Sequence, residues 1–231
     1  MKAYKHLFFD LDRTLWDLDR NSRETLQELY DYYRLEDRGV LNFESFFENY
    51  KQINDRLWDD YRKGQIHKDS LRTERFSKTL QLFDIFDLQL SENIGSSYVE
   101  NSPQKINLMP HTLEVLEFLK GKYHLHIITN GFEEVQHIKL QNSGIASYFS
   151  QIITSEKAQC KKPDPRIFAF ALHASGAKRN ESLMIGDSLE LDILGAKHVG
   201  IDQVYFNPEE TKHRHEITHE IKDLSELMKI V

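Results

Sequence analysis

The sequence predicts an α/β fold in which a doubly wound parallel sheet carries an inserted domain of four helices. The first observation is a set of short apolar runs, at residues 5–9, 124–129, 151–154, 182–186 and 202–206. The second is that helical patterns separate the later runs, at roughly 111–121, 132–142, 165–175 and 189–199. Short apolar runs that alternate with helices indicate buried parallel strands. The expected core is therefore a Rossmann-like sheet with helices on its faces.

Residues 17–105 interrupt this alternation with amphipathic helical stripes. Their apolar residues recur at helical spacing, in the sets Leu26, Leu29, Tyr30, Tyr33; Phe43, Phe46, Phe47, Tyr50; Phe76, Leu80, Phe83; and Ile94, Tyr98. Stripes of this period face a core, and a crossover between parallel strands needs far fewer residues. We therefore expect a core of residues 1–16 and 106–231 and a four-helix insertion at 17–105.

Composition narrows the class of protein. Asp and Glu number 37 against 30 Lys and Arg, a formal net charge of −7, which argues against a basic surface for a nucleic-acid polymer. No apolar run is long enough to cross a membrane. The single cysteine, Cys160, has no intrachain partner, and Met1–Asp10 lacks the apolar stretch of a signal peptide. These features predict a cytoplasmic protein without a membrane partner.

Polar residues stand at the end of each expected strand. Asp10–Thr14 follows the first, Thr129–Gly131 the second and Gly186–Ser188 the fourth, while Lys161–Pro163 lies in the loop after the third. Ligands of doubly wound sheets bind beyond the carboxyl ends of the strands. These side chains should therefore converge on one crevice.

The residue types in that crevice point to phosphate chemistry. Asp10, Asp12 and Asp187 would repel one another without a cation, and Mg²⁺ prefers oxygen ligands while keeping waters for a substrate. Lys162 adds a positive charge, and the helix expected after Gly131 offers free N–H groups to an anion. Together these groups predict a metal-assisted phosphate site.

An aspartate in such a site can attack phosphorus and form an aspartyl-phosphate. Asp12 lies two residues after Asp10, so in extended geometry the two side chains share a face. Asp12 could then protonate the leaving oxygen and later take a proton from water. Each motif alone has an ordinary alternative: a helix cap for Asp12 and Thr14, and a solvated loop for Lys161–Lys162. Their order at successive strand ends favours the site.

These residues resemble the four motifs of the haloacid-dehalogenase-like (HAD) superfamily. The motifs are Asp-x-Asp-x-Thr at Asp10–Thr14, Thr129, Lys162 before a proline, and Gly186-Asp187 followed by Asp192. The helical insertion resembles the family's C1-type cap. Further segments are similar to the nucleoside 5′-monophosphatase branch, namely Thr129–Phe132, Lys139–Leu140, Ser143–Ile145, Lys162–Pro165 and Gly195–Ala196.

The resemblance implies a Mg²⁺-dependent phosphomonoester hydrolase acting through an aspartyl-phosphate. Asp10 would be the nucleophile and a metal ligand, and Asp12 the acid/base that also ligates Mg²⁺ through its backbone carbonyl. Asp187 would ligate the metal directly, and Asp192 would orient a metal-bound water. The phosphoryl group would be held by Thr129, Asn130 and Lys162.

The expected substrate is a small phosphorylated metabolite, a nucleoside 5′-monophosphate first. A phosphatase or phosphomutase on sugar phosphates or other phosphoesters is the alternative, followed by a metal-independent haloacid dehalogenase and by a regulatory protein without activity. The sequence does not select among substrates, because the leaving group is chosen by cap side chains whose arrangement spacing does not reveal. The oligomeric state is equally open, and a monomer is compatible with the sequence.

Four further features are weighed separately. His215–His219 matches the zinc-protease pattern H-E-x-x-H, but Lys222 and Ser225 stand where an extended motif needs Gly and His. A loop leading to an edge strand and a final helix is favoured there, and the role of His213–His219 stays open.

Cys160, near two lysines, is expected to be a plain loop thiol rather than a nucleophile. Gln159 stands where relatives often have glycine, so the path of the loop before Lys162 is uncertain. Trp16 and Asp17 are candidates for substrate contact.

Overall fold

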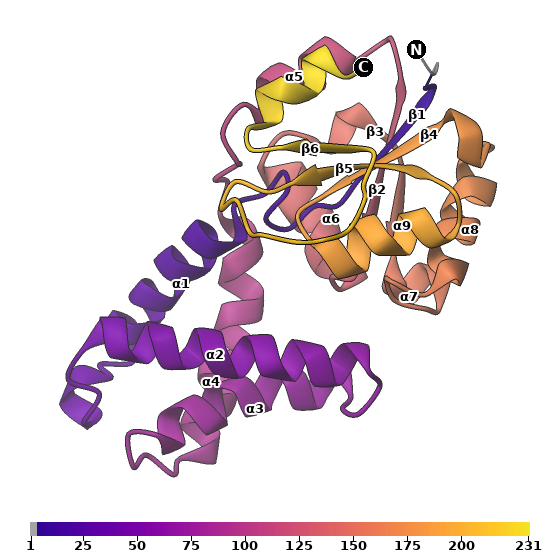
Figure 1. The fold of residues 1–231 in the computed structure, drawn as a ribbon. Coiled ribbons are helices and arrows are strands. Elements are labelled where there is room, and N and C mark those ends of the chain that lie inside the picture. Colours follow the sequence, from indigo (N-terminus) through magenta and orange to yellow (C-terminus); the bar gives the residue numbers. More distant parts are fainter. Residues whose placement is uncertain (1–3) are drawn as a thin grey trace. The chain divides into compact units, whose positions relative to one another are not determined.

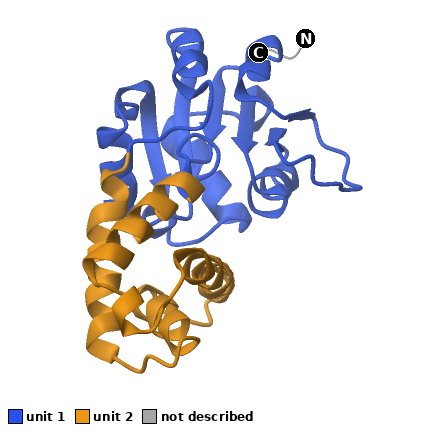
Figure 2. Cartoon of the chain, turned by 90° about the vertical axis from the view of Figure 1, so that its left-hand side faces the viewer, with its two compact units in different colours: residues 1–18, 106–231 blue, residues 19–105 orange. Residues whose placement is uncertain are grey.

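The computed structural model describes residues 4–231. Contacts between Cα atoms divide the chain into two compact units, coloured separately in Figure 2. The first holds the chain up to Leu18 together with Ile106–Val231, and the second is Asp19–Lys105. Each unit has its own hydrophobic core.

The first unit is built on a six-stranded sheet in the order β3-β2-β1-β4-β5-β6 (Figure 1). All five strand pairs are parallel. The strands are β1 (His6–Phe9), β2 (His124–Thr129), β3 (Phe149–Thr154), β4 (Ser182–Gly186), β5 (Asp202–Phe206) and β6 (His219–Ile221). This order is that of a doubly wound fold with β1 beside the switch point. The predicted fold class is confirmed.

The side chains of the strands point alternately to the two faces of the sheet, and each face packs into its own hydrophobic core. Leu7 and Phe9 of β1 lie in one core with residues of α5 and α6, and Phe8 lies in the other with residues of α8 and α9. Because side chains of a strand alternate between faces, this splitting follows from the period of two. The helices of this unit are α5 (Thr112–Leu119), α6 (Glu133–Asn142), α7 (Ser155–Ala158), α8 (Pro165–Ser175), a π-helix at Leu189–Leu194, α9 (Gly195–His198) and a 3₁₀ helix at Leu224–Lys229.

The second unit contains four α-helices around an aromatic core. They are α1 (Leu18–Tyr32), α2 (Phe43–Arg62), α3 (Lys68–Gln81) and α4 (Leu88–Asn101). Asn42 caps α2 by accepting a hydrogen bond from the Ser45 N–H, and Asp87 caps α4 in the same way. The predicted apolar stripes form its core, which includes Leu26, Tyr30, Phe46, Phe47, Tyr50, Phe76, Leu80, Ile94 and Tyr98.

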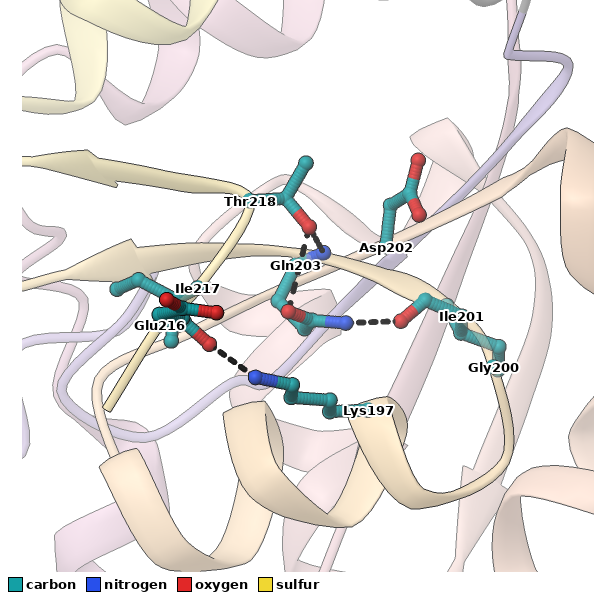
Figure 3. A pocket seen from close by; sticks show the side chains of 8 residues that line it. All are labelled: Lys197, Gly200, Ile201, Asp202, Gln203, Glu216, Ile217 and Thr218. Atoms are coloured by element: carbon teal, nitrogen blue, oxygen red, sulfur yellow. Dashed lines mark hydrogen bonds between the residues drawn. The ribbon is translucent and has the colours of Figure 1, made fainter.

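The H-E-x-x-H segment does not form a helix. His215 lies in an irregular stretch, and His219 begins β6, where it pairs with Val204 of β5. The two histidines therefore do not share a helix face, and the zinc-protease interpretation is excluded in favour of the predicted edge strand. Figure 3 shows a pocket of about 360 Å³ that Glu216, Ile217 and Thr218 of this segment line together with Lys197 and Gln203. It lies at the amino end of β5, away from the strand ends that carry the motifs. None of the helices within residues 4–231 combines the length and apolarity needed to span a bilayer.

Three histidines meet on one face of the sheet, on β1 and β2. His126 is 2% exposed, its Nε2 lies 3.1 Å from Nδ1 of His6, and its ring stacks on Phe8 with centroids 4.8 Å apart. His6 also stacks on His124. Burial, and then the neighbouring His6 and His124, lowers the pKa of His126 to about 4.

The first prediction follows from this buried histidine. In the unfolded chain this histidine has an ordinary pKa of about 6.5 and is protonated at pH values where His126 of the folded protein is still neutral. The free energy of unfolding should therefore fall as the pH drops from about 6.5 towards 4. The expected loss between pH 7 and pH 5 is about 1–2 kcal/mol. His126→Leu should remove most of this loss, measured as the difference between the two proteins in Tm at pH 7 and at pH 5. Equal acid-induced shifts in both proteins would contradict the assignment to His126.

Candidate active site

The site is organised around the end of the central strand β1. Asp10 follows Phe9 directly, and its N–H donates to the Ile185 carbonyl of β4 at 2.9 Å, which extends the ladder by one residue. The residue as a whole is 7% exposed. Asp10 is thus a carboxylate fixed by the sheet itself and almost removed from solvent.

The ammonium group of Lys162 connects three parts of the site. Its Nζ lies 2.5 Å from an oxygen of Asp10 and 2.7 Å from an oxygen of Asp192. It also donates to the Ile128 carbonyl near the end of β2, at 2.8 Å. Lys162 is 2% exposed and Asp192 1%. Burial alone would lower the pKa of Lys162, but the charges of Asp10 and Asp192 raise it above its usual value, so the cation persists at neutral pH.

Asn130 fixes the main chain of Lys162. Its Nδ2 donates to the Lys162 carbonyl at 3.0 Å, and its Oδ1 accepts from the Lys162 N–H at 2.8 Å. The Ser155 hydroxyl in turn donates to the Asn130 carbonyl at 3.3 Å. The side-chain amide of Asn130 is therefore hydrogen-bonded to the lysine loop, and its assignment to the phosphoryl group stays a prediction.

Thr14 joins the first motif to the fourth. Its hydroxyl donates to Asp187 Oδ1 at 3.1 Å and accepts from the Asp187 N–H, also at 3.1 Å. The short side chain of Thr14 therefore fixes the positions of both the main chain and the carboxylate of Asp187. Asp187 itself is only partly buried. Thr14 therefore links the loop after β1 to the loop after β4.

Gly186 makes room for Asp192. A Cβ added to Gly186 would overlap the Asp192 carboxylate, so a side chain at this position would push that carboxylate out of the cluster. Asp192 lies in the π-helix Leu189–Leu194 and accepts from the Ser188 N–H at 3.0 Å. The glycine of the fourth motif is therefore explained by close approach rather than by an unusual backbone angle.

The cluster carries more negative than positive charge. Burial, reinforced by Asp192 and Asp187 and opposed only in part by Lys162, raises the pKa of Asp10 well above its usual range. Burial, with the charge of Asp192, raises the pKa of Asp187 to about 7. Three carboxylates facing one ammonium group leave an excess that a further cation would neutralise.

The donor set fits a hard divalent cation. Oxygen atoms of Asp10, Asp187 and Asp192 lie within 4.8 Å of one another, the one such group of metal-ligating side chains found within residues 4–231. All three donors are carboxylates, which suit Mg²⁺ better than softer metals. The side chain of Asp12 lies outside this group.

Thr129 ends β2 beside the cluster. It is 2% exposed, and its hydroxyl oxygen accepts from the Gly131 N–H at 3.0 Å, which leaves the hydroxyl hydrogen to donate to a ligand. Helix α6 begins at Glu133, whose N–H is taken by a carboxylate oxygen of Glu156 at 2.7 Å. An anion at this strand end would therefore meet the hydroxyl of Thr129 rather than the N–H of Glu133.

Asp12 is held by two side chains that the sequence analysis did not assign. Gln136 donates to Asp12 Oδ2 at 3.0 Å, and Lys139 to Oδ1 at 2.6 Å. Both donors lie on α6 and are buried together with Leu140. Two polar residues on the buried face of an amphipathic helix were the available signal, because such positions usually carry apolar side chains.

Two smaller expectations are settled by burial and local charge. Trp16 was a candidate for substrate contact, but it is fully buried, and Lys139 Nζ lies 4.2 Å from its ring centroid. Cys160 has its pKa raised, by burial and then by Asp164, so it is the plain thiol that the sequence favoured.

The motif order and this geometry agree with comparison to known proteins. The family model described as haloacid dehalogenase-like hydrolase matches residues 4–200. The chain belongs to the haloacid dehalogenase-like hydrolases. This hydrolase is 33% identical to pyrimidine 5′-nucleotidase PynA of Streptococcus pneumoniae, over 89% of the chain and 84% of that protein. It is 30% identical to pyrimidine 5′-nucleotidase YjjG of Escherichia coli, over 87% of the chain and 85% of that protein.

A solved structure supports the same assignment. The putative HAD-hydrolase YfnB of Bacillus subtilis, whose structure is described as bound to magnesium, has a TM-score of 0.88 and 27% identity, and the match covers 99% of each chain. The prediction of an enzyme of the phosphatase type within this family is thereby confirmed.

Gln159 gives the lysine loop of this hydrolase a strained turn. It ends the short helix α7 with a left-handed backbone, φ 54° and ψ 26°, and its N–H donates to the Glu156 carbonyl at 3.2 Å. Left-handed geometry costs a residue with a side chain roughly 1–2 kcal/mol. A glycine at this position would avoid that cost.

The second prediction concerns this turn. Gln159→Gly should stabilise the fold by about 0.5–1 kcal/mol, since relief of strain exceeds the added freedom of the unfolded chain. The expected rise in Tm is about 2–3 °C for a protein of this size. Gln159→Ala is the matched control and should give no such gain, because alanine keeps the Cβ. A glycine variant no more stable than the alanine variant would contradict the assignment of strain.

Proposed function

We propose that this chain is a Mg²⁺-dependent phosphomonoester hydrolase that forms an aspartyl-phosphate at Asp10. The observation that supports this best is the buried Asp10 carboxylate, placed at the end of β1 between the Lys162 cation and the carboxylates Asp187 and Asp192. Nucleophile, cation and metal-ligand set lie together in the first unit. The helical unit, residues 17–105 in our assignment, is proposed as the C1-type cap that the family resemblance implies.

The catalytic groups have separate tasks in this proposal. A carboxylate oxygen of Asp10 attacks phosphorus, the bond from phosphorus to the ester oxygen breaks, and Asp12 donates a proton to the departing alcohol. Water then attacks the phosphorus of the aspartyl-phosphate while Asp12 accepts its proton, which releases inorganic phosphate and restores Asp10. Lys162 and the Thr129 hydroxyl bind phosphoryl oxygens, and Asn130 contributes by fixing the main chain of Lys162.

Mg²⁺ would be held by Asp10, Asp187 and the backbone carbonyl of Asp12, with Asp192 placed to orient a bound water. When bound, it supplies positive charge against the phosphate oxygens and relieves the repulsion among the carboxylates. A haloacid dehalogenase is the weaker candidate, because attack on carbon gives no reason to collect three carboxylates, two of them buried, beside one lysine.

The proposed substrate class is nucleoside 5′-monophosphates, pyrimidine nucleotides first. Two relatives that share at least 30% of residues over most of this chain are called pyrimidine 5′-nucleotidases. Sugar phosphates and other small phosphoesters remain the alternative, and a phosphomutase would be recognised by a product that keeps its phosphate.

The third prediction concerns substrate preference. It is tested by measuring the phosphate released, in the presence of Mg²⁺, from a panel of pyrimidine and purine nucleotides, deoxynucleotides and sugar phosphates. Pyrimidine 5′-monophosphates should give the highest kcat/KM. Asp10→Asn should lower kcat at least about a thousandfold, because the nucleophile is gone.

Circular dichroism and Tm of Asp10→Asn serve as the control. The variant should unfold at no lower temperature than the wild type, since burial of the Asp10 charge is unfavourable and raises its pKa. A folded Asp10→Asn protein with wild-type turnover would disprove the mechanism, and a sugar phosphate as best substrate would replace the nucleotide assignment.

The fourth prediction is metal-dependent stability. Protein stripped with EDTA should gain Tm on addition of Mg²⁺, because binding to the folded state alone adds about 2.7 kcal/mol at a hundred times Kd. Asp187→Asn should lose most of this gain. The exposed Glu190, in the same π-helix as Asp192, provides the control Glu190→Gln, which should keep it. A rise in Tm that NaCl reproduces at equal ionic strength would count against a specific site.

A further inference from the structure

Lys139 is a buried lysine outside the four motifs. It is 5% exposed on α6, and within residues 4–231 Asp12 is the one carboxylate in ion-pair range of its ammonium group, at 2.6 Å. The same ammonium group lies 4.2 Å from the ring centroid of the fully buried Trp16. A buried ammonium is costly unless it is paired, so the position of Lys139 is specified by Asp12 on one side and the indole face on the other.

Gln136 makes a second contact with Asp12. Its side-chain amide is oriented so that the nitrogen meets Asp12 while the amide oxygen stays unpaired. Its Nε2 donates to Asp12 Oδ2 at 3.0 Å, while its Oε1 is buried without a hydrogen-bond partner among the described residues. Gln136 is 1% exposed. A buried amide with an unpaired oxygen is unfavourable, so the retained orientation indicates that the contact with Asp12 matters more than satisfying the amide.

Gly131 leaves the space through which Gln136 reaches Asp12. A Cβ built on Gly131 would overlap the amide nitrogen of Gln136. The backbone of Gly131 does not need a positive φ, so clearance is the reason for glycine at this position. Three residues of one turn and one helix are therefore arranged around a single carboxylate.

We propose that Lys139 and Gln136 are positioning residues that hold Asp12 in its working rotamer, with Trp16 positioning Lys139. The inference rests on the proposed acid/base role of Asp12. A carboxylate has about four acceptor positions. Gln136 and Lys139 each occupy one acceptor position, on Oδ2 and Oδ1 of Asp12 respectively. The remaining acceptor positions are left for the departing alcohol and for water. Misplacing such a group by 1 Å can cost a factor of about 100 in rate.

The test compares two phosphate esters that differ in their need for a proton. The oxygen of a nucleoside leaves as a basic alkoxide unless it is protonated, whereas p-nitrophenyl phosphate releases a stable phenolate. The quantity measured is kcat/KM, which covers binding through departure of the alcohol and omits the later attack by water. Asp12→Asn, the benchmark, should lose about 10²–10⁴-fold on the nucleotide and much less on the nitrophenyl ester.

Lys139→Met keeps the apolar stem and removes the charge. It should lose at least about tenfold more on the nucleotide than on the nitrophenyl ester, and Lys139→Arg should recover most of that loss. A merely structural lysine would lower both values of kcat/KM equally, and that result would overturn the proposal. Gly131→Ala displaces Gln136 and leaves the residues Gln136 and Lys139 themselves unchanged. It too should lower kcat/KM more on the nucleotide than on the nitrophenyl ester.

The two assignments fail in different ways. If Asp12→Asn shows equal losses on both esters, the acid role in the proposed function fails. If Asp12→Asn discriminates and neither Lys139→Met nor Gly131→Ala does, only the positioning role fails. A double-mutant cycle in Tm over Asp12→Asn and Lys139→Met examines the pair without turnover: non-additive losses support it, and additive losses overturn it.

Discussion

The site of this protein depends on the ammonium group of Lys162. Two carboxylates with side-chain exposures of 10% and 1%, from Asp10 and Asp192, are brought within 2.7 Å of it. Without the lysine these buried carboxylates would repel each other and take up protons. Because the same ammonium group donates to Ile128 at the end of β2, one side chain ties β2 to β1 and to the π-helix after β4. The loop that carries Lys162 is in turn fixed by Asn130.

Close approach, rather than backbone freedom, explains the two glycines of the site. A Cβ on Gly186 would overlap the Asp192 carboxylate, and a Cβ on Gly131 would overlap the side-chain amide of Gln136. In both cases a polar side chain from the following helical segment reaches back over the strand end towards Asp10 or Asp12. Such preorganisation lowers the reorganisation that charged groups need during a reaction.

The positions of β1, β2, β4 and β5 could be predicted from the sequence because each of these strands is a short, mainly apolar run that is almost wholly buried. The structure extends the third strand back to Phe149 and replaces the first part of the helix expected at 189–199 by a π-helix at Leu189–Leu194. Apolar content alone does not distinguish these helix types, and π-turns are common where a side chain such as Asp192 must be aimed inward.

The site could be predicted as far as the order of residues along the chain allows. Asp10, Lys162, Asp187 and Asp192 meet because parallel strands end at one edge, which strand order alone implies. The contacts of Asp12 with Gln136 and Lys139 were not predicted, since both donors lie within helix α6 and not at a strand end. The hydrogen bonds between the Asn130 amide and the main chain of Lys162 were equally hidden.

The order of strands also bears on how the site assembles during folding. β1 lies in the interior of the sheet, yet its partners β2 and β4 begin only at His124 and Ser182. The whole helical insertion separates β1 from its first partner along the chain, so neither edge of this apolar strand can pair with its native partner until residues far beyond the insertion are present. Asp10 can acquire its lysine and its acidic neighbours only once those residues, which lie at least 152 positions later in the chain, are present. Competence for chemistry therefore requires the chain through Asp192, and a chain interrupted before β4 carries the proposed nucleophile without the carboxylates that complete its site.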